Sequence, residues 1–295
     1  MKSIRRLYVY ATLLLAVCAV SALTGCAGKK PPVWGDTKSG LILEYRMNPG
    51  DVLKYEMIQE GTEKVEVMGQ TTESATNKTY VYTVEAKGMK GDYHLLEITV
   101  ESLVASMKNV QGEFAAETED VAGESFDMTL SALGDEVDLS DAESIEYGIG
   151  PLGDRSIKSD FEAAFPDLAG KPVKVGDSWA STDTINIDQG NAQIKIISEN
   201  ANTLDGYETV DGVECARIVA DVTGTVSGEG EQMGAPLVFE GTMSGTEIWY
   251  FAYKEGHLVS SESDVNTDIM VTVQAGQEMK IPIKGTARFE IRLIE

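Results

Sequence analysis

The sequence predicts a mainly β fold: long antiparallel strands that form a curved sheet, a half-barrel or a sandwich, with one short central helix. Three observations support this fold class. Apolar and polar residues alternate with a period of two over much of the chain, glycine-containing turns separate the alternating runs, and helical spacing occurs in one short central stretch. Such alternation sends successive side chains to opposite faces of a strand.

The first alternating run begins at Leu41 and ends at Met47. The sequence Asn-Pro-Gly-Asp at 48–51 predicts a turn, because proline and glycine favour turn backbone conformations. Alternation resumes at 53–57. Two further runs, 80–84 and 94–100, flank a turn at 88–92.

Two elements are expected in the middle of the chain. Residues 124–140 should form a hairpin that turns at Gly134-Asp135. After it, Ser159 and Glu162 have the spacing of a capping box, which predicts that Ser159 caps a short helix. Apolar residues follow at helical spacing as far as Phe165, and Pro166 should end the helix.

The C-terminal part predicts three long antiparallel strands in succession. The first ends in Trp249-Tyr250-Phe251, the second spans 264–274 and the third spans 279–293. Residues 254–257 and 275–278 are expected to form the hairpin connections. Each strand could reach ~50 Å at about 3.3 Å per residue.

Strands of this length favour a curved sheet, in which Pro282 and Gly285 are candidates for bends or bulges. The aromatic cluster Trp249–Tyr253 has apolar residues on both faces of its strand. It therefore predicts burial on both sides, and an apolar groove for a lipid or a peptide is the alternative.

The chain shows a weak internal duplication. Three glycine-containing turns recur at offsets of 121 to 126 residues: Gly50 with Gly176, Gly91 with Gly212, and Gly134 with Gly256. The duplication predicts two β-rich halves, 41–150 and 170–295, joined by a connector over 151–169 that contains the short helix. Either each half is a lobe of its own or both close one sheet.

The N-terminus has the organisation of a secretory signal peptide. Three basic residues precede an uncharged stretch from Leu7 to Leu23. The stretch ends in Leu23-Thr24-Gly25-Cys26, which resembles the lipobox of bacterial envelope lipoproteins. This resemblance implies that signal peptidase II removes residues 1–25 by cleaving between Gly25 and Cys26, and that Cys26 carries the lipid, including palmitate.

Residues 26–40 are expected to form a lipidated tether, because they are mostly small, basic or proline and show no apolar periodicity. By analogy with enterobacterial lipoproteins, Ala27 in place of aspartate favours the outer membrane over the inner membrane. The expected location is therefore the bacterial cell envelope, outside the cytoplasm, with membrane contact through the N-terminal lipid.

Charge and cysteine use exclude several classes. The net charge is −24, and removal of residues 1–25, with three basic and no acidic side chains, takes it to about −27. Nucleic acid is not an expected partner, because phosphates require clustered Lys and Arg. Of the three cysteines, Cys18 would be removed with the signal peptide and Cys26 would carry the lipid, which leaves Cys215. The mature body is therefore expected to form no internal disulfide. The context of Cys215 predicts a structural residue.

No cofactor or metal site is predicted. Gly148–Gly153 matches the letters of a dinucleotide-binding motif, but no βαβ pattern surrounds it, so a loop is expected. Asp264–Asp268 resembles the start of a calcium loop but lacks its glycine and glutamate, and a solvated strand face explains it better. A looser divalent-cation site among Asp138, Asp141 and Glu143 remains an alternative.

No catalytic residue is predicted. The two histidines, His94 and His257, have no sequence context of a general base, and no Gly-x-Ser-x-Gly elbow occurs. A zinc site from both histidines and Cys215 would require three distant positions to converge. The protein is therefore expected not to be an enzyme, with a carboxylate-based hydrolase as the remaining alternative.

The favoured function is a lipid-anchored envelope protein whose β body binds or scaffolds another envelope component, with the ligand-binding residues unknown. The β body also loosely resembles the half-barrels of lipoprotein carriers such as LolA and LolB. That resemblance implies the alternative, a carrier that holds a lipid or other apolar ligand in a curved sheet. An apolar cavity lined by Tyr80, Tyr82, Ile283 and Phe289 would favour the carrier, and a filled core would favour the scaffold.

Overall fold

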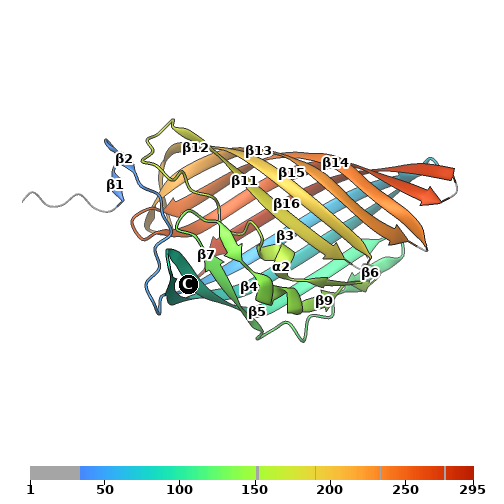
Figure 1. The fold of residues 1–295 in the computed structure, drawn as a ribbon, viewed down its shortest axis with the longest axis horizontal. Helices are drawn as coiled ribbons and strands as arrows, with labels where there is room; N and C mark the ends of the chain where they lie inside the picture. The colour runs from blue at the N-terminus through green and yellow to red at the C-terminus, as the bar shows by residue number, and fades with distance from the viewer. Residues whose placement is uncertain (1–33, 151–152, 190, 233, 276) are drawn as a thin grey trace, which may run out of the picture. The chain divides into compact units, whose positions relative to one another are not determined.

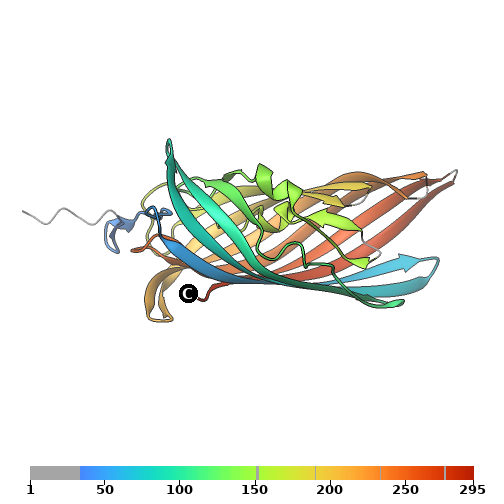
Figure 2. The same ribbon diagram turned by 90° about the horizontal axis from the view of Figure 1, so that it is seen from below.

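The computed structural model describes residues 34–150, 153–189, 191–232, 234–275 and 277–295. Residues Trp34–Glu295 form one compact unit. Most of the unit is a 14-stranded sheet, antiparallel throughout, that curls around one of its faces (Figure 1, Figure 2). The prediction of a mainly β fold with a curved antiparallel sheet or half-barrel is confirmed.

The long strands are β3 (Val52–Val67), β4 (Gln70–Lys90), β5 (Tyr93–Asn109), β11 (Ser178–Gln189), β12 (Ala192–Val210), β13 (Val213–Gln232), β14 (Ala235–Ala252), β15 (His257–Ala275) and β16 (Gln277–Leu293). The short strands are β1 (Gly35–Asp36), β2 (Gly40–Leu41), β6 (Gly112–Ala115), β7 (Ser125–Leu130), β8 (Glu136–Asp138), β9 (Glu146–Gly148) and β10 (Asp154–Ser156). The helices are the α-helix α2 (Lys158–Phe161) and the 3-10 helix η2 (Ser140–Ser144).

The sheet order is β8-β7-β5-β4-β3-β16-β15-β14-β13-β12-β11-β10-β9, with β6 paired to β5. Most neighbours in the sheet are also neighbours in sequence. One exception is the pair β5 and β7, which skips the short strand β6. The long-range exception is the pair β3 and β16, which runs from Tyr55 opposite Leu293 to Val65 opposite Ile283. Strands from 41–150 and from 170–295 therefore belong to one sheet.

The two halves share a detailed local geometry. The turn 48–51 donates an amide to the Ala86 carbonyl and accepts the Ala86 amide, at 2.8 and 2.9 Å. The turn 174–177 makes the same exchange with Leu204, at 2.8 and 3.0 Å. A register shift follows directly after Ala86 and again directly after Leu204. The recurring glycine turns thus coincide with a repeated strand-turn arrangement.

The segment after β2 corrects the first predicted strand. Residues 42–48 alternate between buried and partly exposed side chains but belong to no strand. The Tyr45 amide instead donates to Ala132 at 2.9 Å, and the Arg46 amide donates to Gly256 at 2.9 Å. This extended segment lies along two loops, with one side on the core. The alternation of apolar and polar residues in this segment therefore results from burial of one side of an extended chain. The prediction of a strand over 41–47 is wrong beyond Leu41.

The central helix is shorter than the sequence predicts and begins earlier. Helix α2 has four residues, and its N-cap position is Ile157, which makes no side-chain capping bond. The hydroxyl of Ser156 accepts the Lys158 amide at 3.1 Å. Glu162 lies past the helix and accepts the Asn186 amide of β11 at 2.6 Å. The capping box on Ser159 is therefore wrong, because Glu162 bonds to a strand distant in sequence.

The predicted hairpins are confirmed, but the predicted bulges are not. Strands β7 and β8 form the hairpin around Gly134-Asp135, and β14, β15 and β16 form the three long C-terminal strands. The register of β15 with β16 runs unbroken through Pro282 and Gly285. A register shift occurs instead at Tyr250/Phe251 between β14 and β15. Pro282 lies just past the last residue of β16 that pairs with β3, where it costs no ladder hydrogen bond to that strand.

The core fills one end of the concave face. Residues 154–168, which we call the plug, begin with the sheet strand β10, and from Ile157 onward they contain α2 and pack into the core inside the curl of the sheet (Figure 2). The Phe161 ring packs edge-on against Tyr80, Tyr82 and Phe126, with centroids 5.1 to 5.7 Å apart. The plug thus covers the inner surface of β4 and β7 at this end.

The aromatic cluster on β14 is buried on both faces, as predicted. Trp249 and Phe251 belong to the main core. Ala252 belongs to a second, smaller cluster with Cys215 and Val259, against which Tyr250 packs. Both sides of β14 are therefore covered at this point.

Candidate ligand-binding face

The face of the sheet that carries the core continues beyond the plug. Residues directly opposite each other on paired antiparallel strands lie on the same face. Four core residues lie in one row across the strands and mark the concave face: Met57, Ile291, Trp249 and Ile218. Every second residue along each strand from these positions faces the same way, up to the far end of the strand. The rule identifies which side chains face the inside of the curl.

At the far end, the concave face is apolar over seven adjacent strands, and we call this surface the apolar band. Its members are Val65 and Val67 (β3), Ile281 and Ile283 (β16), Ile269 and Val271 (β15), Phe239 (β14), Val226 (β13), Ile194 and Ile196 (β12), and Ile185 and Ile187 (β11).

The residues between them face the convex side and are mostly polar. They include Lys64, Glu66, Lys284, Asp268, Glu240, Thr242, Thr225, Ser227, Lys195, Thr184 and Asn186. The sheet is therefore amphipathic, with its apolar side inward.

The apolar band is not filled by the core. Except for Val226 and Val271, which are 3% and 5% exposed, its side chains are partly exposed. None of its members belongs to the hydrophobic clusters of the described residues or packs against them. Contiguous exposed apolar surface of this kind marks an interaction or ligand-binding site in soluble proteins.

Glycines interrupt the apolar residues on this part of the concave face. Gly224, Gly228, Gly241 and Gly245 face inward on β13 and β14. A Cβ atom on Gly245 would lie 2.2 Å from the Asp264 carbonyl oxygen. Glycine is therefore required where the curled strands approach each other. Beside Gly224, Gly228 and Gly241, the side chains of Met243, Ile194 and Ile269 lie close to the place that a Cβ atom would take.

Between the apolar band and the filled core lie carboxylates without basic partners. Asp183 and Glu247 face inward from β11 and β14, and Glu136 and Asp167 approach from the plug side. We call these four residues the acidic wall. Burial raises the pKa of Glu247 and of Asp167 to about 7, and Asp183 adds repulsion to both. Burial also raises the pKa of Glu136 and of Asp183.

A cavity of about 480 Å³ adjoins the acidic wall, and we call it the seam pocket. It lies where the sheet does not close, between β8 on one side and β11 on the other, with plug residues behind. Asp183 lines the seam pocket, and two residues further along the same face of β11 is Ile185 of the apolar band. Thr182, Thr184 and Asn186 also line the pocket, and they lie on the opposite face of β11 from Ile185. The pocket is therefore at the free edge of β11, and Asp183 is the residue that it shares with the concave face.

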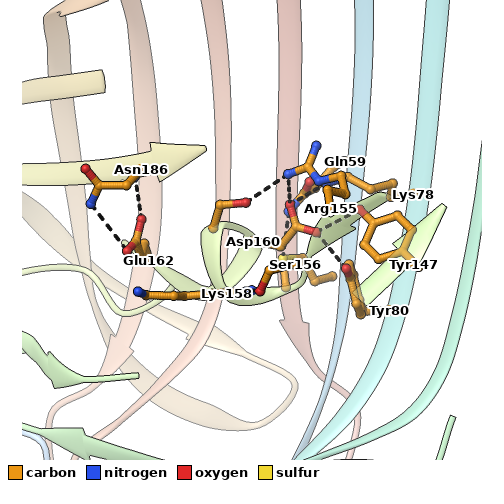
Figure 3. Close-up of polar contacts among 12 residues, drawn as sticks. Gln59, Lys78, Tyr80, Tyr147, Arg155, Ser156, Lys158, Asp160, Glu162 and Asn186 are labelled. Carbon is orange, nitrogen blue, oxygen red and sulfur yellow. Dashed lines mark hydrogen bonds and ion pairs between the residues drawn. The ribbon is translucent and has the colours of Figure 1, made fainter. Parts of the chain in front are cut away.

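The plug is held in place by a buried ionic network (Figure 3). The Asp160 carboxylate accepts hydrogen bonds from the hydroxyls of Tyr80 and Tyr147 at 2.6 and 3.1 Å, and from Arg155 at 3.0 Å. Lys78 of β4 forms an ion pair with the same carboxylate. Although burial raises the pKa of Asp160, the two cations outweigh it and hold the pKa below its usual value. Burial lowers the pKa of Lys78 to about 8.

The four residues expected to line an apolar cavity are divided between filled and open regions. Tyr80 and Tyr82 are buried under the plug at 0% and 2% exposure. Ile283 belongs to the apolar band, and Phe289, on the same face of β16, is 39% exposed. The sequence alone missed the acidic wall and the role of Asp160, because the partners of these residues come from distant segments.

The histidines and Cys215 lie in separate surroundings. The His94 side chain is buried and bonds to the Tyr45 carbonyl at 2.9 Å. His257 begins β15, and burial lowers its pKa. The Cys215 thiol is buried, donates to Val213 at 3.5 Å, and has its pKa raised by burial to about 11. These contacts agree with the structural interpretation of Cys215.

The remaining sequence motifs fall on ordinary strand and loop positions. Gly148 ends β9, which pairs antiparallel with β10, so Gly148–Gly153 spans a hairpin loop whose residues 151–152 lie outside the description. Asp264 and Asp268 are exposed on β15, as a solvated strand face requires. In the described part of the chain, no group of three or more His, Cys, Asp or Glu residues has an arrangement that could hold a metal ion, and this includes Asp138, Asp141 and Glu143. The cleavage site at Gly25 and the lipidation site Cys26 lie outside the described residues.

Comparison with known proteins gives little further information. Within the described ranges, no helix has the length and apolar character needed to cross a membrane. No family model and no curated protein matches the chain. Among solved structures, the crystal structure of Pseudomonas aeruginosa OccK2 (OpdF) is similar at 7% sequence identity and a TM-score of 0.27, covering 83% of this chain and 98% of that chain. A likeness at this level supports no argument about function, so the chain is assigned to no family.

Proposed function

We propose that the protein is a lipid-anchored, extracytoplasmic protein of the bacterial cell envelope that binds a lipid or another apolar ligand against the apolar band. The single observation that supports binding is the open, apolar concave face beyond the plug. Each 100 Å² of apolar surface removed from water contributes about 2.5 kcal/mol, so a long hydrocarbon chain laid along the band would be held well. The ligand stays inside the curl while the convex face stays in water.

This proposal favours the carrier over the scaffold. A filled core would leave the concave face without a binding role, and the core fills only the end under the plug. The carboxylates of the acidic wall all have a pKa shifted upward. Acid–base catalysis by paired carboxylates needs environments that push their pKa values apart. We therefore propose binding without catalysis.

The anchor part of the proposal is supported by the lipobox resemblance at Leu23-Thr24-Gly25-Cys26. Its test is Cys26→Ser in cells supplied with radiolabelled palmitate. We expect an unprocessed precursor without label, and unchanged labelling would remove the assignment of the lipid to Cys26. Fractionation of the envelope would then test the expected outer-membrane location.

The binding part is tested on the body, residues 34–295, which contains every described core contact. Native mass spectrometry of the body purified from cells without detergent is expected to show a retained lipid mass. After delipidation, the body should bind the neutral fluorophore Nile red and lose it on addition of a long-chain lipid. A body that carries no lipid and binds no Nile red would contradict the proposal and favour the scaffold.

A matched pair of variants on β15 locates the binding surface. Ile269→Glu places a charge on the apolar band, and Met270→Glu places the same charge on the adjacent, convex position, which is 36% exposed. We expect Ile269→Glu to weaken Nile red binding at least tenfold and Met270→Glu to leave it unchanged. Equal effects of the two variants would show that the fluorophore binds elsewhere.

A further inference from the structure

We propose that the ligand is an amphiphile with a cationic, amine-type head group, which lies against Asp183 and Glu247 of the acidic wall while its hydrocarbon chain follows the apolar band. This inference rests on the proposed function and names the class of ligand. It is supported by the charges that face the inside of the curl and by the position of Asp183 and Glu247 on the same face of the sheet as the apolar band.

The charge on the open part of the concave face is negative. Following the strand pairs outward from the core, the inward positions of the described long strands carry Glu63, Asp183 and Glu247. The basic residues of the same strand segments, such as Lys64 and Lys284, alternate with the inward positions and face the convex side. An anionic head group would therefore meet like charge along this face.

Lys78 is a basic residue that does face inward, but its ammonium already forms an ion pair with Asp160. Both Lys78 and Arg155 pair with the Asp160 carboxylate, and their side chains are only 10% and 16% exposed. This network carries one positive charge more than negative charge, so it is the rival site for an anionic head group. However, Lys78 and Arg155 both contact the Asp160 carboxylate, which also accepts hydrogen bonds from the hydroxyls of Tyr80 and Tyr147. Both cations therefore already have an anionic partner.

The negative charges of the acidic wall are not balanced by basic side chains in this way. Among the described residues, none of its four carboxylates forms an ion pair with Lys or Arg. Burial and mutual repulsion raise their pKa values, which means that a nearby cation would be stabilising. Among the described residues that line the seam pocket, Lys158 is the basic one, and its ammonium pairs with Glu143 at 3.4 Å.

The geometry also accommodates a chain. Along β11, Asp183 lines the seam pocket and is followed on the same face by Ile185 and Ile187. The neighbouring strand continues this surface with Ile194 and Ile196. From Asp183 to Gln189, at the end of β11, the strand covers ~20 Å at about 3.3 Å per residue. A long alkyl chain can therefore lie on the band with its head group at the acidic wall.

The test compares three ligands with the same hydrocarbon chain: hexadecylamine, hexadecanol and hexadecanoic acid. Each displaces Nile red from the delipidated body at pH 8, below its critical micelle concentration. We expect hexadecylamine to displace Nile red at about tenfold lower concentration than hexadecanol, and hexadecanoic acid to be the weakest. The double variant Asp183→Asn with Glu247→Gln should bring hexadecylamine to the level of hexadecanol.

The control variant is Glu240→Gln, which removes a carboxylate from the convex side of β14 and should keep the preference for the amine. The double variant is expected to fold, because it removes mutual repulsion, and its thermal transition checks this. Equal displacement by all three ligands would overturn the head-group inference and leave the proposed function standing. Tightest binding of hexadecanoic acid would overturn it in favour of the Lys78–Arg155 network. Displacement by none of them would contradict the proposed function itself.

Discussion

Replacement of Asp160 by asparagine should be among the most destabilising single changes in the body. Asp160 is 8% exposed and is the common partner of Lys78 and Arg155. Asparagine keeps the shape of the side chain but leaves two nearly buried cations beside each other without a counter-charge. Loss of one partner of a buried ion pair costs about 3–5 kcal/mol, and we expect the free energy of unfolding to fall by that amount.

The assay is urea unfolding of the body, followed by tryptophan fluorescence. With a denaturant slope of about 2–3 kcal/mol per molar for a domain of this size, the midpoint should fall by about 1–2 M. Because the folded pKa of Asp160 is below its unfolded value, its contribution is present above about pH 4 and is lost as the pH falls further. The cost of Asp160→Asn should therefore shrink on acidification.

Two comparisons make this prediction specific. Lys78→Met leaves Arg155 paired with Asp160, so it should cost clearly less than Asp160→Asn. Asp268→Asn removes a surface partner of Lys284 at 3.6 Å, where both side chains are more than half exposed, and should change stability by less than about 0.5 kcal/mol. If the free energy of unfolding of Asp160→Asn lies within about 1 kcal/mol of the value for the parent protein, the network does not hold the plug and the reasoning fails.

Two further predictions concern the sheet itself. The folded pKa of Glu247, about 7, lies above its unfolded value of 4.5, so its ionisation destabilises the fold as the pH rises between these values. Glu247→Gln should therefore raise the unfolding free energy by about 1–2 kcal/mol at pH 8 and leave it unchanged at pH 4, and an equal gain at both pH values would contradict this cause. Gly245→Ala should cost about 1–3 kcal/mol, because its Cβ would lie 2.2 Å from a backbone oxygen. Gly206→Ala, with no atom within 4 Å of the added carbon, should be neutral or slightly stabilising in the same urea assay.

The strands could be predicted because one face of each is apolar and the other polar. This pattern is clearest in β15 and β16, where the predicted hairpin has an unbroken register. The same pattern misled at 42–48, because an extended segment that lies on a core alternates in burial without pairing in a sheet. Sequence spacing also favoured a capping box at Ser159, where Glu162 in fact bonds to β11.

Only part of the candidate site could be predicted from the sequence. Ile283 could be assigned to an inward face, but where the core stops depends on how far the plug extends along that face. Lys78 and Asp160 are 82 residues apart, and no local pattern links them. Asp183 and Glu247 could not be distinguished among the 48 acidic residues of the chain until the curl brought them together.

The pairing of β16 with β3 has a consequence for biogenesis. Until the last strand is delivered, β3 presents unpaired backbone groups along the residues that finally meet it, from Tyr55 to Val65. Exposed strand edges of this length recruit other chains and promote aggregation. We expect nascent or truncated forms that lack β16 to depend on chaperone protection, and a chain with its C-terminal strand removed to accumulate as insoluble material even though every other hairpin is intact.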